Sequence, residues 1–505
     1  DNLDPRILTS TAHQLVQFAI FESLVRTHQN DVLPGMAERW EVSEDGKVYT
    51  FYLRDAKWSD GKPVTADDFV HAFVRMFEIC PASPIYDDIL NGAQLRAGEV
   101  PPEELGVKAL DEKTVQITLR NPVPYFLSLI GHSFGSPGRA DLVEKFGEGY
   151  GASAESLASN GPFVLKEWKH EDMIVIEKNP DYWNADAIKL DKVVFYVIPN
   201  HDTRRNMFDN GELDWFVPAT TSEVEWYRSQ GLLHEYARGG VSYLQLNRYG
   251  QNDPIKAKIL SNPNFVKAIS YAIDRQGYID SVLQGNALPA TAMVPPATGI
   301  YPGKTWGDVS PNFGKFHPET ADLAKSQEYM QKVLDDLGFK SVDEFPEFDL
   351  LTSADPTDPK EITSYILSVL MDMGLKVNVR IATGKQFWDS IYEPALEYDF
   401  ARLGWGPDYD DPHTYMGYWV TESTDMGVTY DNAEYDALLD KANKEVDLVK
   451  RAEILAEAEA LFLDTAPAVP LLWNKGTIAI QPWVKGVTFA LSGLTTDYIY
   501  ADIEK

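Results

Sequence analysis

The stretch that organises this sequence is residues 402–412, which read Arg-Leu-Gly-Trp-Gly-Pro-Asp-Tyr-Asp-Asp-Pro. The segment just before it, residues 398–401, predicts a buried strand, and we expect Gly404, Gly406 and Pro407 to end that strand at once. A strand end that opens into an irregular loop is where an α/β sheet usually presents its binding groups. This loop is therefore the first candidate for a functional site.

The loop carries the side chains that a zwitterionic ligand needs. Asp408 and two further aspartates suit an ammonium group, and the guanidinium of Arg402 suits a carboxylate. The rings of Trp405 and Tyr409 would line the space between the two charges. The alternative is a solvated acidic turn after a core strand, and residue types alone do not decide between the two.

Composition limits the classes of function. The chain has 505 residues, 44% of them hydrophobic, so we expect a well-folded protein of about three domains at ~150 residues each. Its 77 acidic and 45 basic residues give a formal charge of -32. That charge disfavours nucleic acid and anionic membranes as partners, and it attracts the cationic ends of ligands. A generally acidic surface is also explained by solubility alone.

Membrane insertion is not expected, because no run of about 18 apolar residues occurs. The sequence begins at Asp1 and not at methionine, which favours the removal of a targeting segment and leaves open a lipid anchor upstream of Asp1. Cys80 is the single cysteine, so there is no intrachain disulfide and no thiolate metal site. We expect Cys80 to be a small buried hydrophobe.

Periodicity predicts mixed α/β structure. We expect a helix capped by Thr65, with two aspartates in its first turn, and a loop over residues 81–88. Residues 348–351, 360–373 and 377–381 predict a strand, a helix and a strand, which is one right-handed crossover of a parallel sheet. We also place domain boundaries near residues 160–162 and 238–240.

None of the usual catalytic arrangements is present. The sequence has no Gly-x-Ser-x-Gly elbow, no phosphate-binding loop ending in Gly-Lys-Ser or Gly-Lys-Thr, and no His-Glu-x-x-His motif. The nine histidines are scattered without ligand spacing. The aspartates at 408, 410 and 411 lack the glycine and distal glutamate of a calcium loop. We therefore expect no enzyme activity, no catalytic residues, no metal and no cofactor.

Motifs along the whole chain carry a family resemblance. The sequence resembles the solute-binding proteins of peptide ABC transporters, the oligopeptide-binding protein family, also called extracellular solute-binding family 5. The resemblance covers nearly all 505 residues. The motifs that carry it are Leu3-Asp4-Pro5, residues 21–24 (Phe-Glu-Ser-Leu), 34–40 (Pro-Gly-Met-Ala-Glu-Arg-Trp), 49–54 (Tyr-Thr-Phe-Tyr-Leu-Arg), 57–69 (Lys-Trp-Ser-Asp-Gly-Lys-Pro-Val-Thr-Ala-Asp-Asp-Phe), 160–163 (Asn-Gly-Pro-Phe), 179–183 (Asn-Pro-Asp-Tyr-Trp), 272–275 (Ala-Ile-Asp-Arg), and Gly404-Trp405 with Asp408-Tyr409.

The resemblance implies an α/β fold of the type II periplasmic-binding-protein class, with two lobes that close over the ligand and an additional third domain. On this basis lobe I comprises residues 1–36, 161–240 and 480–505. The additional domain comprises residues 37–160, and the second ligand-binding lobe comprises residues 241–479.

The resemblance also assigns ligand-binding roles. It implies that Asp408, with Tyr409 beside it, pairs with the free ammonium of a peptide and that Arg402 pairs with the carboxylate of short peptides. The backbone beside Trp405, from Gly404 to Gly406, would hydrogen-bond the extended peptide from one side.

Further contacts are implied on the other side of the peptide. The segment Thr9, Ser10 and Thr11 would hydrogen-bond the peptide there, although Thr9 stands where relatives can carry an acidic residue. Tyr86 or its neighbour Ile85 would occupy the place of a tyrosine that meets the ammonium. Main-chain hydrogen bonds are the same for every peptide, so strand addition would explain tolerance of many side chains.

The implied partners are an oligopeptide and the permease subunits of an ABC importer. We expect a monomer, located in a periplasm or held on the cell surface as a lipoprotein. The alternatives are a receptor of the same fold for an oligosaccharide, an opine or a metal chelate, and a peptide-binding chaperone or hydrolase.

Overall fold

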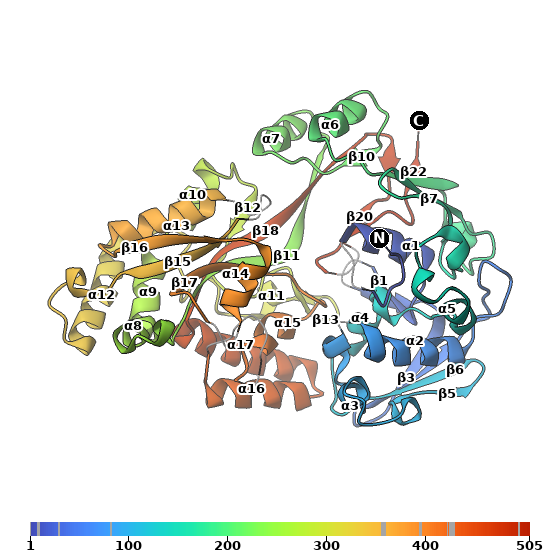
Figure 1. Cartoon of the computed structure of the whole chain (residues 1–505), viewed down its shortest axis with the longest axis horizontal. Coiled ribbons are helices and arrows are strands. Elements are labelled where there is room, and N and C mark those ends of the chain that lie inside the picture. Colours follow the sequence, from blue (N-terminus) through green and yellow to red (C-terminus); the bar gives the residue numbers. More distant parts are fainter. Residues whose placement is uncertain are drawn as a thin grey trace. The chain divides into compact units, whose positions relative to one another are not determined.

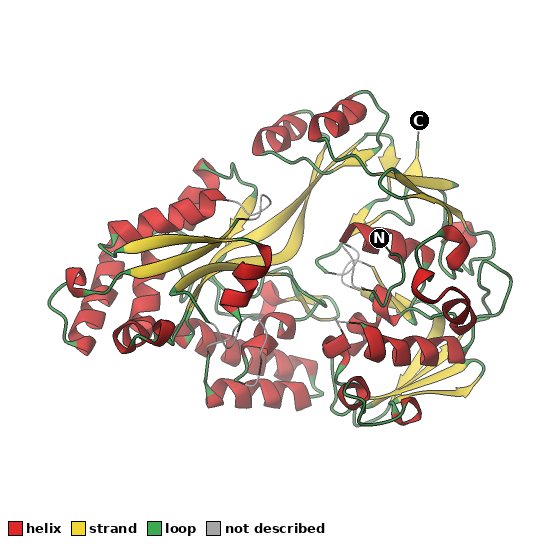
Figure 2. Cartoon of the chain, in the orientation of Figure 1, coloured by secondary structure: helices red, strands yellow, loops and turns green. Residues whose placement is uncertain are grey.

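The structure is a computed structural model that describes residues 2–7, 11–28, 31–80, 83–354, 360–392, 396–421, 423, 430–492 and 495–504. The chain forms two compact units (Figure 1). Unit 1 comprises Asp1–Tyr236, Asp408–Asp410 and Thr477–Lys505, and unit 2 comprises Ala237–Pro407 and Asp411–Gly476. Both units mix helices and strands (Figure 2).

Unit 1 contains a four-stranded antiparallel sheet in the order β3-β4-β6-β5. Its strands are β3 (Ala37–Val42), β4 (Val48–Leu53), β5 (Val107–Asp111) and β6 (Thr114–Thr118). Helix α2 (Ala66–Ile79) buries Phe69, Phe73 and Phe77. The expected cap at Thr65 is confirmed, since Thr65 and Asp68 form a capping box. Cys80 is buried, as expected.

A second sheet of unit 1 has the order β7-β8-β9 and is antiparallel throughout. Its strands are β7 (Phe163–Lys169), β8 (Met173–Lys178) and β9 (Lys192–Tyr196). The other elements of unit 1 are α1 (Thr11–Ile20), β1 (Val25–His28), β2 (Asp31–Pro34), α3 (Gly92–Arg96), α4 (Phe126–Ile130), α5 (Ala140–Phe146), α6 (His201–Asp209), β10 (Trp215–Phe216), α7 (Thr221–Ser229), β19 (Val484–Lys485), β20 (Thr488–Phe489), β21 (Thr496–Asp497) and β22 (Asp502–Ile503).

Unit 2 is built around the strands β18 (Ala468–Ile480), β11 (Leu233–Leu246), β17 (Phe400–Trp405), β15 (Phe348–Ser353) and β16 (Val377–Ala382), which neighbour one another in that order. β11 and β18 continue into unit 1, where β10 pairs with the last residues of β18. The predicted strand, helix and strand are confirmed, with β15 and β16 parallel and α13 (Lys360–Asp372) between them in sequence.

Helices supply the rest of the apolar core of unit 2. One buried cluster includes residues of α9 (Pro263–Ala272), α12 (Leu323–Leu337) and α13, and another includes residues of α16 (Ala433–Lys444) and α17 (Leu448–Thr465). The remaining elements of this unit are α8 (Pro254–Leu260), α10 (Arg275–Ser281), β12 (Ala287–Pro289), β13 (Gly299–Tyr301), β14 (Lys304–Thr305), α11 (Trp306–Val309), α14 (Gly384–Ile391) and α15 (His413–Met416).

The domain boundary expected near residues 238–240 lies close to the division between the two units, at Tyr236 and Ala237, although β11 runs unbroken across it. Two local predictions need correction. Residues 81–88 were expected to be loop, yet Ser83–Tyr86 form one 3-10 turn. The expected end of the strand before Arg402 is also wrong, as described below.

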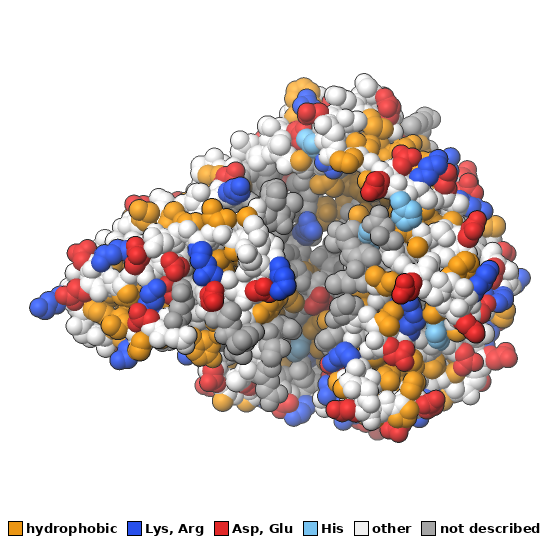
Figure 3. Space-filling model, viewed as in Figure 1, with side chains coloured by type: hydrophobic (Ala, Val, Ile, Leu, Met, Phe, Trp, Pro, Cys, Tyr) orange, Lys and Arg blue, Asp and Glu red, His pale blue; other side chains and the backbone are white. Residues whose placement is uncertain are grey.

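The acidic surface is dispersed. On the face that Figure 3 shows, Asp and Glu side chains are interspersed with Lys and Arg. Among the described residues no helix is long and apolar enough to cross a membrane, and no group of metal-ligating side chains is found.

Candidate functional site

Strand β17 carries the first part of the organising stretch. It extends from Phe400 to Trp405, so Arg402 and Gly404 lie within the strand and not in a loop. The antiparallel partner β11 holds them in place, with Ser242 opposite Gly404. A glycine does not break a ladder whose neighbours fix the backbone, and the strand ends only before Pro407, which has no N–H to donate.

One edge of β17 lacks a described partner beyond Ala401. The parallel pairing with β15 covers only Phe400 and Ala401. On the side of β11, Asn247 N–H donates to Asp399 O. In an antiparallel ladder only every second residue of a strand bonds to a given neighbour, so the odd-numbered residues of β17 bond to β11. The N–H and C=O of Gly404 therefore point away from β11, towards the edge that β15 leaves open.

Arg402 lies half-buried beside this edge. Its Nη1 donates to the hydroxyl of Ser242, with 3.3 Å between the two atoms. Burial lowers the pKa of the Arg402 guanidinium, and the nearby Tyr278 acts in the opposite direction. Arg402 is thus a partly desolvated cation on the strand whose edge is open.

Trp405 is anchored by its own surroundings. The indole Nε1 donates to Thr414 O over 2.8 Å, and the ring centroid lies 4.5 Å from that of Tyr418. The next residue, Gly406, is exposed, and a side chain there would touch nothing within 4 Å. The tryptophan therefore fixes the end of β17, and open space follows it.

Asp408 belongs to unit 1, although Pro407 and Asp411 belong to unit 2. It is half-buried. Tyr86, the tyrosine expected near a ligand ammonium, is 1% exposed, and its hydroxyl donates to Leu129 O over 3.2 Å. Burial raises the pKa of Tyr86 well above its usual value, and the charge of Asp408 adds a smaller increase. The aspartate and the tyrosine therefore interact within unit 1.

Tyr409 packs in the core of unit 1. Its ring stacks on Tyr125, with 4.1 Å between the centroids and 5° between the planes. The N–H of Asp410 donates to the hydroxyl of Ser128. These contacts hold the backbone next to Asp408. Sequence reasoning missed Tyr125 and Ser128. The signal that could have found Tyr125 is its position directly after the prolines in residues 122–125 (Pro-Val-Pro-Tyr).

Asp411 has a structural partner that sequence reasoning missed. Its two oxygens accept from Nη1 and Nη2 of Arg451, at 2.7 and 2.8 Å, and both side chains are buried within unit 2. The signal was an arginine one turn before the apolar residues Ile454 and Leu455 of the same helix. Of the three aspartates in the stretch, Asp411 is thus neutralised inside the fold.

Some predicted residues remain outside this description. Thr9 and Ser10 lie outside the described residues, and Thr11 is the first residue of α1. In unit 2 the structure groups Arg402, Gly404 and Trp405 on one strand, and in unit 1 it groups Asp408, Tyr409 and Tyr86.

Comparison with known proteins gives the family. The model of the bacterial extracellular solute-binding proteins, family 5, matches residues 31–427. The chain belongs to this family. The predicted family and the predicted fold class are confirmed: family 5 proteins have a two-lobed type II fold with an extra domain, and this chain shares it.

Three similar proteins illustrate the likeness. The oligopeptide-binding protein OppA of Bacillus subtilis is 30% identical over 483 residues, 94% of this chain and 85% of that protein. The probable deoxycholate-binding periplasmic protein YgiS of Escherichia coli is 29% identical over 510 residues, 99% of this chain and 90% of that protein. The structure of Listeria monocytogenes OppA bound to peptide covers 100% of this chain and 97% of its own, with a TM-score of 0.76 and 27% identity.

Proposed function

We propose that this protein captures oligopeptides outside the cytoplasm and delivers them to the permease of an ABC importer. The observation that carries the proposal is the open edge of β17, where Gly404 presents its N–H and C=O beside the half-buried Arg402. An extended peptide matches such an edge, because its main chain offers acceptors and donors at the same spacing.

The charges assign the peptide's two ends. We propose that Asp408 pairs with the ammonium, because burying an ammonium without a partner would cost several kcal/mol. Arg402 then takes the carboxylate of a short peptide, with Trp405 beside the peptide and Tyr86 behind Asp408. The segment Thr9, Ser10 and Thr11 contributes from the N-terminal side, as the family resemblance implies.

The proposal extends to the organisation of the chain. Lobe I comprises residues 1–36, 161–240 and 480–505, the additional domain residues 37–160, and the second ligand-binding lobe residues 241–479. We propose that the lobes close over the peptide, that the protein acts as a monomer without catalysis, and that it works in a periplasm or from a lipid anchor.

The test is peptide affinity measured by calorimetry after Asp408→Asn. We expect a loss of about 2–5 kcal/mol, the range for truncating a buried charge pair. Asp410→Asn removes the same charge two residues away and should change affinity much less. An N-acetylated peptide should bind wild type weakly and be insensitive to Asp408→Asn. Equal affinity of Asp408→Asn and wild type for a free peptide would refute the assignment.

A second candidate is a receptor for a non-peptide solute, which the likeness to the probable deoxycholate-binding protein favours. Incubation with a peptide mixture and with bile acids, followed by mass spectrometry of what stays bound, separates the two. The same spectra report any cleavage of the peptides, which would identify a hydrolase.

A further inference from the structure

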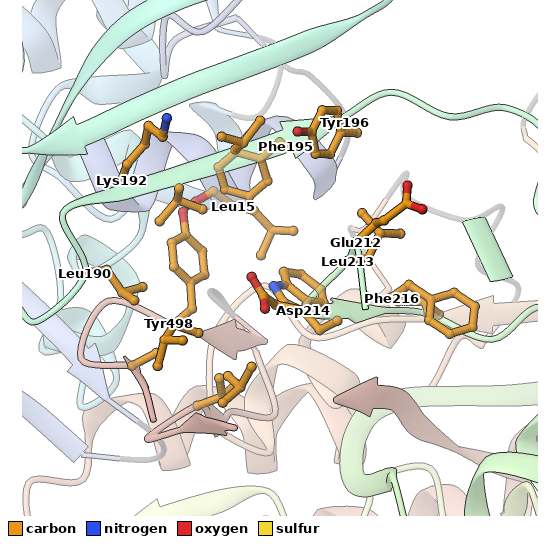
Figure 4. Close-up of a pocket in the computed structure, with 18 of the residues that line it drawn as sticks. Leu15, Leu190, Lys192, Phe195, Tyr196, Glu212, Leu213, Asp214, Phe216 and Tyr498 are labelled. Carbon is orange, nitrogen blue, oxygen red and sulfur yellow. The ribbon is translucent and has the colours of Figure 1, made fainter. Parts of the chain in front are cut away.

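Unit 1 contains a pocket of about 530 Å³ that lies away from the candidate site. Its walls are β9, the segment 212–217 that includes β10, and residues of the C-terminal part within 484–487 and 498–503 (Figure 4). None of the described residues assigned to the peptide site lines it. The volume lies within the range of about 300–1,000 Å³ that is typical of ligand pockets.

Aromatic and hydrogen-bond contacts fix part of the pocket lining. Phe195 meets Tyr498 edge to face, with 5.7 Å between the ring centroids. The hydroxyl of Tyr498 donates to Leu15 O over 2.8 Å. Since these contacts tie β9, the C-terminal segment and α1 together, the pocket is a preformed feature of the fold.

β9 presents an open edge to this pocket. Lys178 N–H donates to Asp191 O, and Val197 N–H donates to Asp172 O, both over 2.8 Å. These bonds set the alternation of the antiparallel ladder with β8, so the odd-numbered residues of β9 bond to β8. The N–H and C=O of Lys192, Val194 and Tyr196 point outwards, and no described strand pairs with that edge.

β10 is also an edge strand of its sheet. It pairs with β18 through Trp215 opposite Ile480, and Gln481 N–H donates to Asp214 O. By the same alternation the N–H and C=O of Trp215 point away from β18, and no described strand pairs with them. Two strand edges with outward main-chain groups therefore contribute to the lining of one pocket.

Charges stand at both ends of β9. Figure 4 shows Lys192 at one end of the pocket and Glu212 on the side of Tyr196, at the other. A peptide that ran antiparallel to β9 would have its carboxylate at the Lys192 end and its ammonium at the Glu212 end. An edge of alternating donors and acceptors between a cation and an anion is complementary to a short zwitterionic peptide.

We propose that this pocket is a second peptide site, which binds an extended peptide of about five residues as an added strand antiparallel to β9. The apolar residues of the lining, such as Val193 and Val487, contact its side chains. Lys192 pairs with its carboxylate and Glu212 pairs with its ammonium. This site goes beyond the proposed transport site, because it uses none of the residues assigned there and lies within unit 1 alone.

The test is hydrogen–deuterium exchange of the full chain, read separately for residues 192–197 and 402–409. The probe is the free pentapeptide Ala-Val-Ala-Val-Ala. We expect the outward amides of β9 to exchange freely without ligand. At a peptide concentration of 100 times Kd, their exchange rate should fall about a hundredfold. Protection of residues 402–409 reports peptide binding at the proposed transport site. The two segments are read separately, so the absence of binding at one site is distinguished from its absence at the other.

Val194→Pro is the decisive variant. It removes one outward N–H and places a ring on the open edge, while the bonds of β9 to β8 are kept; proline is tolerated on such an edge. Val194→Ala keeps the N–H and is the matched control. We expect protection of residues 192–197 to be lost in Val194→Pro and kept in Val194→Ala, with 402–409 unchanged in both.

The outcomes decide the proposal. No protection of residues 192–197 in wild type, or protection that survives Val194→Pro, would overturn it. A pentapeptide with acetylated and amidated ends should need at least about tenfold more ligand for the same protection. Equal protection by the capped peptide would overturn the role of Lys192 and Glu212.

Discussion

The buried pair of Asp411 and Arg451 allows a quantitative prediction about unit 2. The two side chains are 5% and 0% exposed, and two hydrogen bonds of 2.7 and 2.8 Å join them. Asp411→Ala leaves the guanidinium buried without its counter-ion, which costs about 3–5 kcal/mol. At about 1.4 kcal/mol per factor of ten, exchange of the most protected amides of α17 should become roughly 100- to 4,000-fold faster.

The assay is hydrogen–deuterium exchange of residues 448–465, under conditions where unit 2 recloses faster than its amides exchange. This readout reports on unit 2 by itself, whereas a global unfolding curve combines the contributions of both units.

Two further variants serve as controls for this prediction. Asp440→Ala breaks an exposed pair with Lys444, whose side chains are 63% and 60% exposed, and should change stability by at most about 0.5 kcal/mol. The double variant Asp411→Leu with Arg451→Met removes both charges and should recover most of the loss. If Asp411→Ala exchanged no faster than Asp440→Ala, the buried pair would not stabilise unit 2 and our interpretation of Asp411 would be wrong.

Two other predictions concern pH and buried acceptors. The hydrogen bond that protonated His28 Nδ1 donates to the carboxylate of Asp497, over 3.2 Å, raises the pKa of His28. Burial raises the pKa of Asp497, but the bond to His28 and the nearby Arg26 lower it overall. The pair therefore stabilises the folded state between the unfolded pKa of Asp497 and the raised pKa of His28. We expect His28→Gln to lower the free energy of unfolding by about 0.5–1 kcal/mol at pH 5, seen as a lower Tm, and to leave the Tm at pH 9 unchanged. The buried carboxylate of Glu459 accepts hydrogen bonds from Trp306, Ser310 and Asn312 at 2.8–3.0 Å. Glu459→Ala should therefore lower stability in thermal unfolding by about 2–4 kcal/mol, and Glu459→Gln, which keeps one acceptor oxygen, by clearly less. Equal losses in the two variants would show that packing, and not the loss of acceptors, determines the effect.

Local structure was largely predictable from the sequence. The cap at Thr65 and the strand, helix and strand over residues 348–382 follow from short-range patterns, because capping and periodicity act within a few residues. Glycine was the main source of error. Gly404 was expected to end a strand, yet the neighbouring strand β11 holds its backbone in a ladder.

The candidate site was predictable only in part. Arg402, Trp405 and Asp408 stand out in the sequence because charged and aromatic side chains gather after an apolar run. The partners of these residues and their neighbours, such as Ser242, Tyr125 and Arg451, lie from 40 to more than 280 positions away and carry no local signal.

By itself the sequence determined the family, the mixed α/β class and the stretch that carries the candidate ligand groups, since these depend on residue types and their order. Only the tertiary structure decided that Asp411 is neutralised by Arg451, that Tyr409 packs in the core of unit 1, and that β9 and β17 present open edges. Pairing between strands and burial of charges depend on residues brought together from distant parts of the chain, and no local pattern encodes them.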